Sequence, residues 1–309
     1  MPHLALKKAA EEAQATLSIY GALRSSLRTE MLKQASQRQK RGIARFKKLA
    51  RAQQKQWKRP IAQWLEEMRK RTAAGLRQPA DTIVEMPAIE KVLDWTKFDA
   101  WTLNHFKPIL GDTLRAGGDS LFRARRLIKQ DGFDPITAAA VAWINEHGLE
   151  LVADINGKTK EGVIQLIAQG IKAGKHPREI AREIRSYIGV TGKMAQALAN
   201  REEWIILNRP DLGPAAISNA MDAYARKQIR RRAETIARTE TASGLNEGIR
   251  QSYGQMGYTK LQRVEDPVGE DEWNCDCREE NGTVYTLEES QGILPAHPNC
   301  EGTWVAYID

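Results

Sequence analysis

The chain has few cysteines, and all of them lie close to one end. Cys275, Cys277 and Cys300 fall within the last 35 of its 309 residues. Three clustered cysteines do not provide the paired framework of a disulfide-stapled secreted domain. In a reducing compartment, clustered thiols with a nearby histidine indicate metal binding more than disulfide formation.

Long apolar runs are also missing. No stretch approaches the roughly 18 consecutive apolar residues that a membrane-spanning helix needs. The first eight residues, Met1 to Lys8, contain no apolar stretch long enough for a secretory signal. We therefore expect no membrane contact and a protein made and used in a cytoplasm. The length of 309 residues favours two domains over one.

Acidic residues are absent from one long segment. Residues 31–60 hold 11 Lys and Arg and no Asp or Glu. Residues 1–78 hold 19 basic residues against 5 acidic ones, a net charge of +14. Residues 264–309 hold Arg278 against 12 acidic residues, a net charge of −11. The two ends therefore predict different partners.

Residues 1–78 read as a basic helical arm. From Glu11 to Arg71 the composition favours helix, with Gly42 and Pro60 as the expected kinks or breaks. Apolar residues recur at spacings of three and four, as one buried stripe requires. They are Leu17, Tyr20, Leu23, Leu27 and Met31, then Ile43, Phe46, Leu49, Ala50, Trp57, Ile61, Trp64, Leu65 and Met68. Prolines and polar residues mark a linker over 79–90.

Residues 91–257 predict a domain of shorter amphipathic helices. Asp134-Pro135 is typical of a helix start, and Thr159 of the cap of a helix that stops at Gly174. A helix follows His176-Pro177 and ends near Gly189, and another runs from Asp222 through Tyr253. Residues 258–309 change to β-like runs at 260–264, 282–286 and 303–308. The expected fold is mainly α, with a small α+β module at the C-terminus.

An ordered set of motifs in the C-terminal third resembles a known family. It comprises Ala233 to Thr241 with its Arg238-Thr239-Glu240 core, then Asn246 and Gly248, the cysteine pair, residues 281–285, and the closing His297-Pro298-Asn299-Cys300. This order is similar to the Mu F-like phage head morphogenesis family, over about residues 135–305. The chain has Cys-x-Cys where the family more often has Cys-x-x-Cys, and it lacks the family's last cysteine.

The resemblance implies a structural role in a virion rather than an enzyme. Members are minor head proteins of tailed bacteriophages, present in a few copies, associated with the portal, other head proteins and packaged double-stranded DNA. Such a protein is assembled in the bacterial host cytoplasm. Arg238, Thr239, Glu240 and Asn246 are then structural: we expect Arg238 and Glu240 to pair with the β module and Thr239 to pack.

Cys275, Cys277, His297 and Cys300 supply four ligands suited to one tetrahedral structural Zn²⁺. Zinc would stabilise a module with little core of its own. The alternative is that these are ordinary loop residues, with cysteine buried as a small apolar side chain.

The acid-free segment is the candidate contact for DNA or an acidic portal surface. Binding through lysine and arginine would be independent of sequence and sensitive to salt. Trp57 and Trp64 either stack on bases or pack on a partner helix. A second basic cluster at 226–232 either serves similarly or faces the acidic module. The candidate contacts are Lys33, Arg38, Lys40, Arg41, Arg45, Lys47, Lys48, Arg51, Lys55, Lys58 and Arg59.

Three other functions remain open. A non-structural DNA-binding protein would use the same arm, but it gives no reason for the C-terminal motif set. A Cys–His hydrolase would use His297 and Cys300 with Asn299, although the acidic surroundings would raise a thiol pKa. A toxin-like transferase would need Arg238, Thr239 and Glu240 to converge, whereas consecutive helical residues fan out by about 100°.

Overall fold

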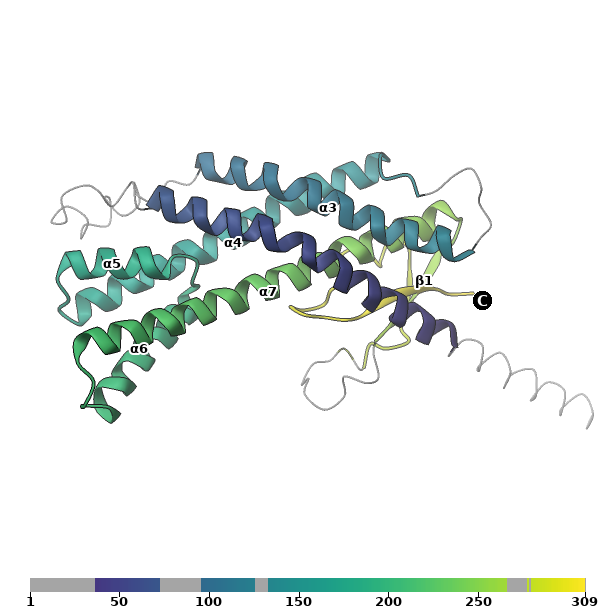
Figure 1. Cartoon of the computed structure of the whole chain (residues 1–309). Helices are drawn as coiled ribbons and strands as arrows, with labels where there is room; N and C mark the ends of the chain where they lie inside the picture. Colours follow the sequence, from purple (N-terminus) through teal and green to yellow (C-terminus); the bar gives the residue numbers. More distant parts are fainter. Residues whose placement is uncertain (1–36, 73–95, 126–132, 266–276, 278, 309) are drawn as a thin grey trace, which may run out of the picture.

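The structure is a computed structural model that describes residues 37–72, 96–125, 133–265, 277 and 279–308. It is an elongated helical bundle with a small three-stranded sheet against one end (Figure 1). The predicted class, mainly α with a small C-terminal β module, is confirmed. The expected linker at 79–90, the candidate residues Lys33 and Cys275, and the arm before residue 37 lie outside the described residues.

The described part of the basic arm is one helix over residues 37–72. It is unbroken at Gly42 and Pro60, so the expected break at either residue is wrong. Gly42 is where the helix approaches the sheet, because a Cβ there would lie 2.8 Å from Val305 Cγ1. Pro60 lies between the buried side chains of Trp57 and Ile61, whose packing holds the helix on both sides of the proline.

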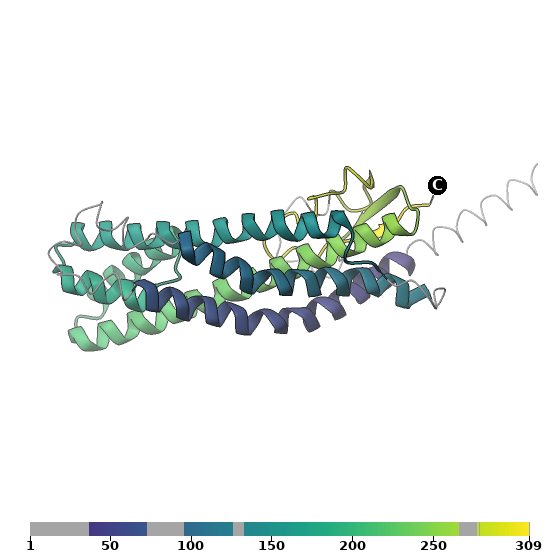
Figure 2. The same cartoon turned by 90° about the horizontal axis from the view of Figure 1, so that it is seen from above.

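The described residues form five further helices of the bundle, and three of them are long. They are α3 (Thr96–Arg125), α4 (Ala138–Lys172), α5 (Pro177–Tyr187), α6 (Gly192–Asn208) and α7 (Pro214–Gln255). The helix over 37–72, α3, α4 and α7 run along the length of the molecule, whereas α5 and α6 lie at the end away from the sheet (Figure 2). The expectation of shorter helices is therefore wrong for α3 and α4, whereas the long helix predicted from Asp222 through Tyr253 is confirmed as part of α7, which begins earlier, at Pro214.

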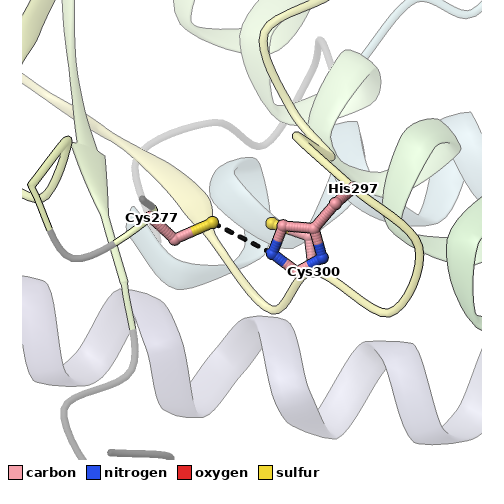
Figure 3. Close-up of side chains that lie close together, drawn as sticks. All are labelled: Cys277, His297 and Cys300. Carbon is pink, nitrogen blue, oxygen red and sulfur yellow. Dashed lines mark hydrogen bonds between the residues drawn. The ribbon is translucent and has the colours of Figure 1, made fainter. Parts of the chain in front are cut away.

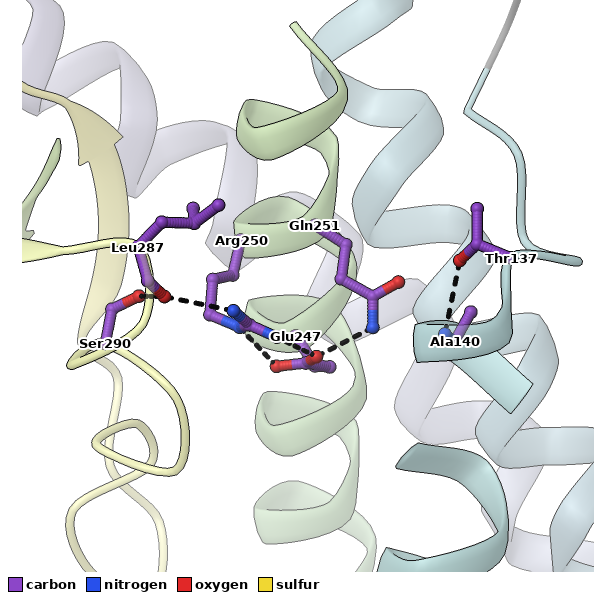
Figure 4. Close-up of polar contacts among 7 residues, drawn as sticks. All are labelled: Thr137, Ala140, Glu247, Arg250, Gln251, Leu287 and Ser290. Atoms are coloured by element: carbon purple, nitrogen blue, oxygen red, sulfur yellow. Dashed lines mark hydrogen bonds and ion pairs between the residues drawn. The ribbon is translucent and has the colours of Figure 1, made fainter. Parts of the chain in front are cut away.

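Two predicted helix starts are also wrong. The first turn of α4 begins after Pro135, at Ala138, where Thr137 Oγ1 accepts a hydrogen bond from the backbone N–H of Ala140 over 3.2 Å (Figure 4). Thr159 caps nothing, because it lies inside α4 and its hydroxyl donates to the carbonyl of Ile155 over 2.7 Å. The predicted stop at Gly174 and the helix after His176 are confirmed.

The core includes both tryptophans of the basic helix. The Trp57 ring packs edge-on against Phe106 of α3, with centroids 5.5 Å apart. Trp64 Nε1 donates to Asn156 Oδ1 of α4 over 3.1 Å. Both rings are buried, so they are unavailable for stacking on bases, and the helix over 37–72 shares one core with α3 and α4.

Glycines let α3 and α7 approach closely. A Cβ on Gly117 of α3 would collide with the backbone of Leu245 in α7, and a Cβ on Gly248 of α7 would collide with the carbonyl oxygen of Leu114 in α3. The Gly248 of the sequence motif is therefore explained by packing. The close contact at Gly248 places the second half of α7 against α3, and the opposite face of α7 points toward the sheet.

The sheet confirms the three predicted β runs. Strands β1 (Lys260–Val264), β2 (Val284–Thr286) and β3 (Thr303–Ala306) pair antiparallel in the order β2-β1-β3. Gln262 of β1 is opposite Val284 on one side and Val305 on the other. Among the described helices, none is long and apolar enough to cross a membrane.

Candidate metal centre and basic face

Three of the four expected metal ligands come together beside the sheet. The ligand atoms of Cys277, His297 and Cys300 all lie within 4.8 Å of one another (Figure 3). His297 Nε2 is 3.0 Å from Cys277 Sγ, and Cys300 is buried. This group could hold a metal ion, since two thiols and one imidazole are ligands that zinc prefers. Cys275, the expected fourth ligand, lies outside the described residues.

The turn that carries the histidine sets its orientation. His297 Nδ1 is 2.9 Å from the carbonyl oxygen of Pro298. A carbonyl only accepts hydrogen bonds, so this contact assigns the proton to Nδ1 and leaves the lone pair on Nε2, which faces Cys277. That tautomer is the one in which imidazole ligates a metal through Nε2. The backbone N–H of Cys300 donates to the carbonyl of His297 over 3.1 Å and closes the turn.

Helix α7 holds this turn from the side of the bundle. The backbone N–H of Asn299 donates to Thr239 Oγ1 over 3.3 Å. Asn246 Nδ2 donates to the carbonyl oxygen of Gly302 over 3.0 Å, and the Asn246 side chain is buried. These two contacts flank Cys300 in the sequence. The motif residues Thr239 and Asn246 therefore position the turn that carries the candidate ligands.

The other two motif residues do not pair as expected. Glu240 pairs with His147 of α4, with Oε2 2.7 Å from His147 Nε2, and not with the β module. His147 stacks on Trp143 of the same helix, which fixes its ring. Arg238 is exposed and forms no ion pair with any described residue. The expectation that Glu240 pairs with the module is therefore wrong, because its side chain points toward α4, whereas the expected pairing of Arg238 stays a prediction.

A second contact between α7 and the module was not predicted. Arg250 Nη1 donates to the carbonyl oxygen of Leu287 over 3.0 Å, and Nη2 pairs with Glu247 Oε1 over 2.7 Å (Figure 4). Gln251 Nε2 donates to the same carboxylate oxygen over 2.7 Å. The spacing of Glu247 and Arg250, three apart on a helix, is the signal that was available in the sequence.

The surroundings of the candidate ligands are buried and charged. Burial raises the pKa of the Cys300 thiol, and the backbone N–H groups of Ala296 and Gly302 oppose that shift. Glu265 pairs with Arg263 at 2.6 Å, and burial raises the pKa of its carboxyl group. A raised thiol pKa opposes nucleophilic reactivity, whereas a bound cation would stabilise the thiolate directly.

The basic face lies on the helix over 37–72. The residues of this face are exposed, and they recur at helical spacing over about 29 Å between residues 40 and 59. They are Lys40, Arg41, Lys48, Arg51, Lys55, Lys58 and Arg59.

Three other basic residues of the helix turn toward the module. Lys47 Nζ pairs with Glu301 Oε2 at 3.1 Å, directly after Cys300. Arg45 is half-buried and, together with the exposed Arg38, lines a cavity of about 210 Å³ beside Trp304. Lys47 therefore binds the acidic module, and it is not part of the free basic face.

The second basic cluster, at 226–232, also has one residue that is bound within the protein and others that are exposed. Arg232 is buried and donates to Thr159 Oγ1, to the Gly189 carbonyl and to the Ile155 carbonyl, at 2.7, 2.7 and 2.8 Å. Burial lowers the pKa of its guanidinium to about 10. Arg232 therefore binds neither DNA nor the acidic module. Arg226, Lys227, Arg230 and Arg231 are exposed on the first half of α7, away from the module (Figure 1).

Comparison with known proteins identifies no relative. No protein-family model matches the chain, and no curated protein or solved structure matches it.

Proposed function

We propose that the chain is a minor head protein of a tailed bacteriophage. It has a structural role in head morphogenesis, docks near the portal with other head proteins, and contacts packaged DNA. The observation that carries this proposal is the convergence of the motif set in one place. Thr239 and Asn246 of α7 bind the turn at 299–302. This turn directly follows His297-Pro298, and His297 contacts Cys277. Pieces that are 60 residues apart in the sequence, such as Thr239 and Asn299, therefore act as one unit.

The module would hold one structural Zn²⁺. Cys277, His297 and Cys300 provide two thiolates and an imidazole, and Cys275 is proposed as the fourth ligand. A closed four-ligand site fixes the fold and leaves no position for a reacting water. The strands of the sheet have five, three and four residues, so the module has little core of its own and a metal would contribute much of its stability.

The basic face supports the contact with DNA. Seven exposed lysines and arginines lie on a helix whose opposite side is anchored in the core by Trp57, Trp64 and Met68. A rigid helix presents these cations at fixed spacing, so several phosphates can be bound at once with release of their counterions. A non-structural DNA-binding protein would use the same face, but it gives no role to the module.

A Cys–His hydrolase is the enzymatic alternative, because His297 faces Cys277 at 3.0 Å. The two functions differ in how the thiols respond to zinc. In the structural site, zinc protects Cys277 and Cys300 from alkylation by iodoacetamide. In a hydrolase, a thiol remains reactive and activity survives a chelator.

The proposal is tested by deleting the gene from the phage that encodes the chain. The lysate is then examined by electron microscopy, with the intact gene supplied on a plasmid as the control. We expect few DNA-filled heads after deletion and normal heads after complementation. A normal yield of infectious, DNA-filled particles without the gene would contradict the proposal.

A further inference from the structure

The end of the bundle away from the sheet exposes large apolar side chains. On α6, Trp204 is 47% exposed, Ile206 55% and Leu207 72%, and Ile171 at the end of α4 is 48% exposed. Ile206 and Leu207 also border a cavity of about 400 Å³ between α4, α5, α6 and α7. Apolar residues continue into this cavity, where Leu166, Leu198 and Met221 form part of its lining. We call this cavity and its apolar border the end groove.

The charges of the end groove are mostly negative. Glu183, Glu202 and Glu203 line it, with Lys175 as the cation among them. Lys175 Nζ pairs with Glu183 at 2.7 Å and with Glu202 at 2.8 Å, and three carboxylates against one ammonium leave a formal charge of −2 on the lining. A ligand with an apolar stripe beside lysine or arginine would complement this surface.

The N-terminal segment of the chain has that chemistry. In residues 17–33, Leu17, Tyr20, Leu27 and Met31 follow the spacing by which an amphipathic helix anchors in a groove. The same segment carries Arg24, Arg28 and Lys33 against a single acid, Glu30. By contrast, residues 73–95 hold four acids, Asp81, Glu85, Glu90 and Asp94, against Arg77 and Lys91, and would be repelled.

The geometry places this segment beyond reach of the groove in its own chain. The helix over 37–72 starts beside the sheet, whereas α5 and α6 lie at the opposite end (Figures 1 and 2). That helix is about 54 Å long, and a helix of 17 residues is only about 25 Å long. As a helix, residues 17–33 could therefore not return from residue 37 to their own end groove.

We propose that the end groove binds residues 17–33 of a second copy of this chain. The contact is head-to-tail, because two different surfaces meet. Such contacts either close into a ring or continue as a filament. The inference rests on the exposed residues of the groove and on the charges of both surfaces, and it does not depend on the phage function.

The test is analytical ultracentrifugation of the full-length, nuclease-treated chain from about 1 to 100 μM, a range suited to micromolar contacts. Leu207→Asp alters the groove, and Leu27→Asp alters the N-terminal segment. Val141→Asp is the matched control, because Val141 is 45% exposed on α4 outside the groove. Thermal unfolding by circular dichroism checks that all three variants fold.

We expect wild type and Val141→Asp to associate as concentration rises. Each of the other variants should weaken association at least about tenfold. An equimolar mixture of Leu207→Asp and Leu27→Asp should form dimers and nothing larger, because one intact groove meets one intact segment. A monomeric wild type, association that survives Leu27→Asp or Leu207→Asp, or a mixture that stays monomeric would each overturn the proposal.

Discussion

Asn246 of α7 donates a hydrogen bond to the carbonyl oxygen of Gly302, two residues after the candidate ligand Cys300, over 3.0 Å. Its side chain is 1% exposed, so loss of the amide would leave that carbonyl without this donor inside the contact between α7 and the module. We expect Asn246→Ala to lower the free energy of unfolding by about 1–3 kcal/mol. Denaturant unfolding measures this change. Asn200→Ala, at an exposed asparagine of α6, is the control and should change stability by less than about 0.5 kcal/mol. Equal losses in both variants would refute the role of Asn246.

Two glycine-to-alanine substitutions should have opposite effects on stability, because only Gly248 lies at the close contact of α3 and α7. Gly248→Ala would bring a Cβ into the carbonyl of Leu114, so we expect a loss of about 3 kcal/mol. Gly157→Ala, on the exposed side of α4, meets nothing within 4 Å and should gain about 0.5–1 kcal/mol from helix propensity. Thermal or denaturant unfolding compares the two. A stable Gly248→Ala variant would show that α3 and α7 do not meet as described.

The metal proposal predicts about one zinc per chain in the purified protein. Cys300→Ser and His297→Ala should each lose most of it, because one ligand is gone, as elemental analysis would show. Cobalt loading gives an independent measurement, since thiolate ligands produce a charge-transfer band that Cys277→Ser should weaken. Glu289→Gln, an exposed carboxylate in the same module, is the control and should keep its metal. A folded wild-type chain that never takes up zinc or cobalt would reject the site.

The basic face predicts a salt-dependent contact with duplex DNA. Replacement of Lys48, Arg51, Lys55 and Lys58 with glutamine should weaken binding and flatten the dependence of affinity on salt. The slope of log K against log salt should fall by about 0.9 for each phosphate contact removed. The control replaces four exposed cations of α7, Arg226, Lys227, Arg230 and Arg231, with glutamine. If both quadruple variants behave alike in a titration by fluorescence anisotropy, the basic face is not a specific DNA contact.

Local patterns predicted much of the fold. The alternation at 260–264 gave β1 with its observed ends, and the apolar stripe from Ile43 to Met68 predicted the buried face of the helix over 37–72. The break expected at Thr159 is absent, because Leu151, Ile155, Val163 and Ile167 keep one stripe buried across it. A threonine that caps a helix and one inside a helix look alike in sequence, and packing decides between them.

The sequence predicted which residues make up the candidate site, but it did not predict the contacts between helices that surround it. Three thiols and a histidine near the C-terminus indicated metal ligands, and the structure brings three of these four residues together. The partner of Glu240 is His147, 93 residues away, and Arg232 is buried against α4 rather than displayed. Such contacts depend on which helices become neighbours, and no local spacing encodes that.

The most direct test of the account is quantitative mass spectrometry of phage heads purified from lysates of the cells in which this chain is produced. The abundance of the chain is measured relative to the portal protein, with heads separated from free protein by a density gradient. The account predicts that the chain is present in the heads, at a few copies per portal ring. Its absence from heads, with all of the protein free in the lysate, would contradict the account and favour a non-structural DNA-binding protein.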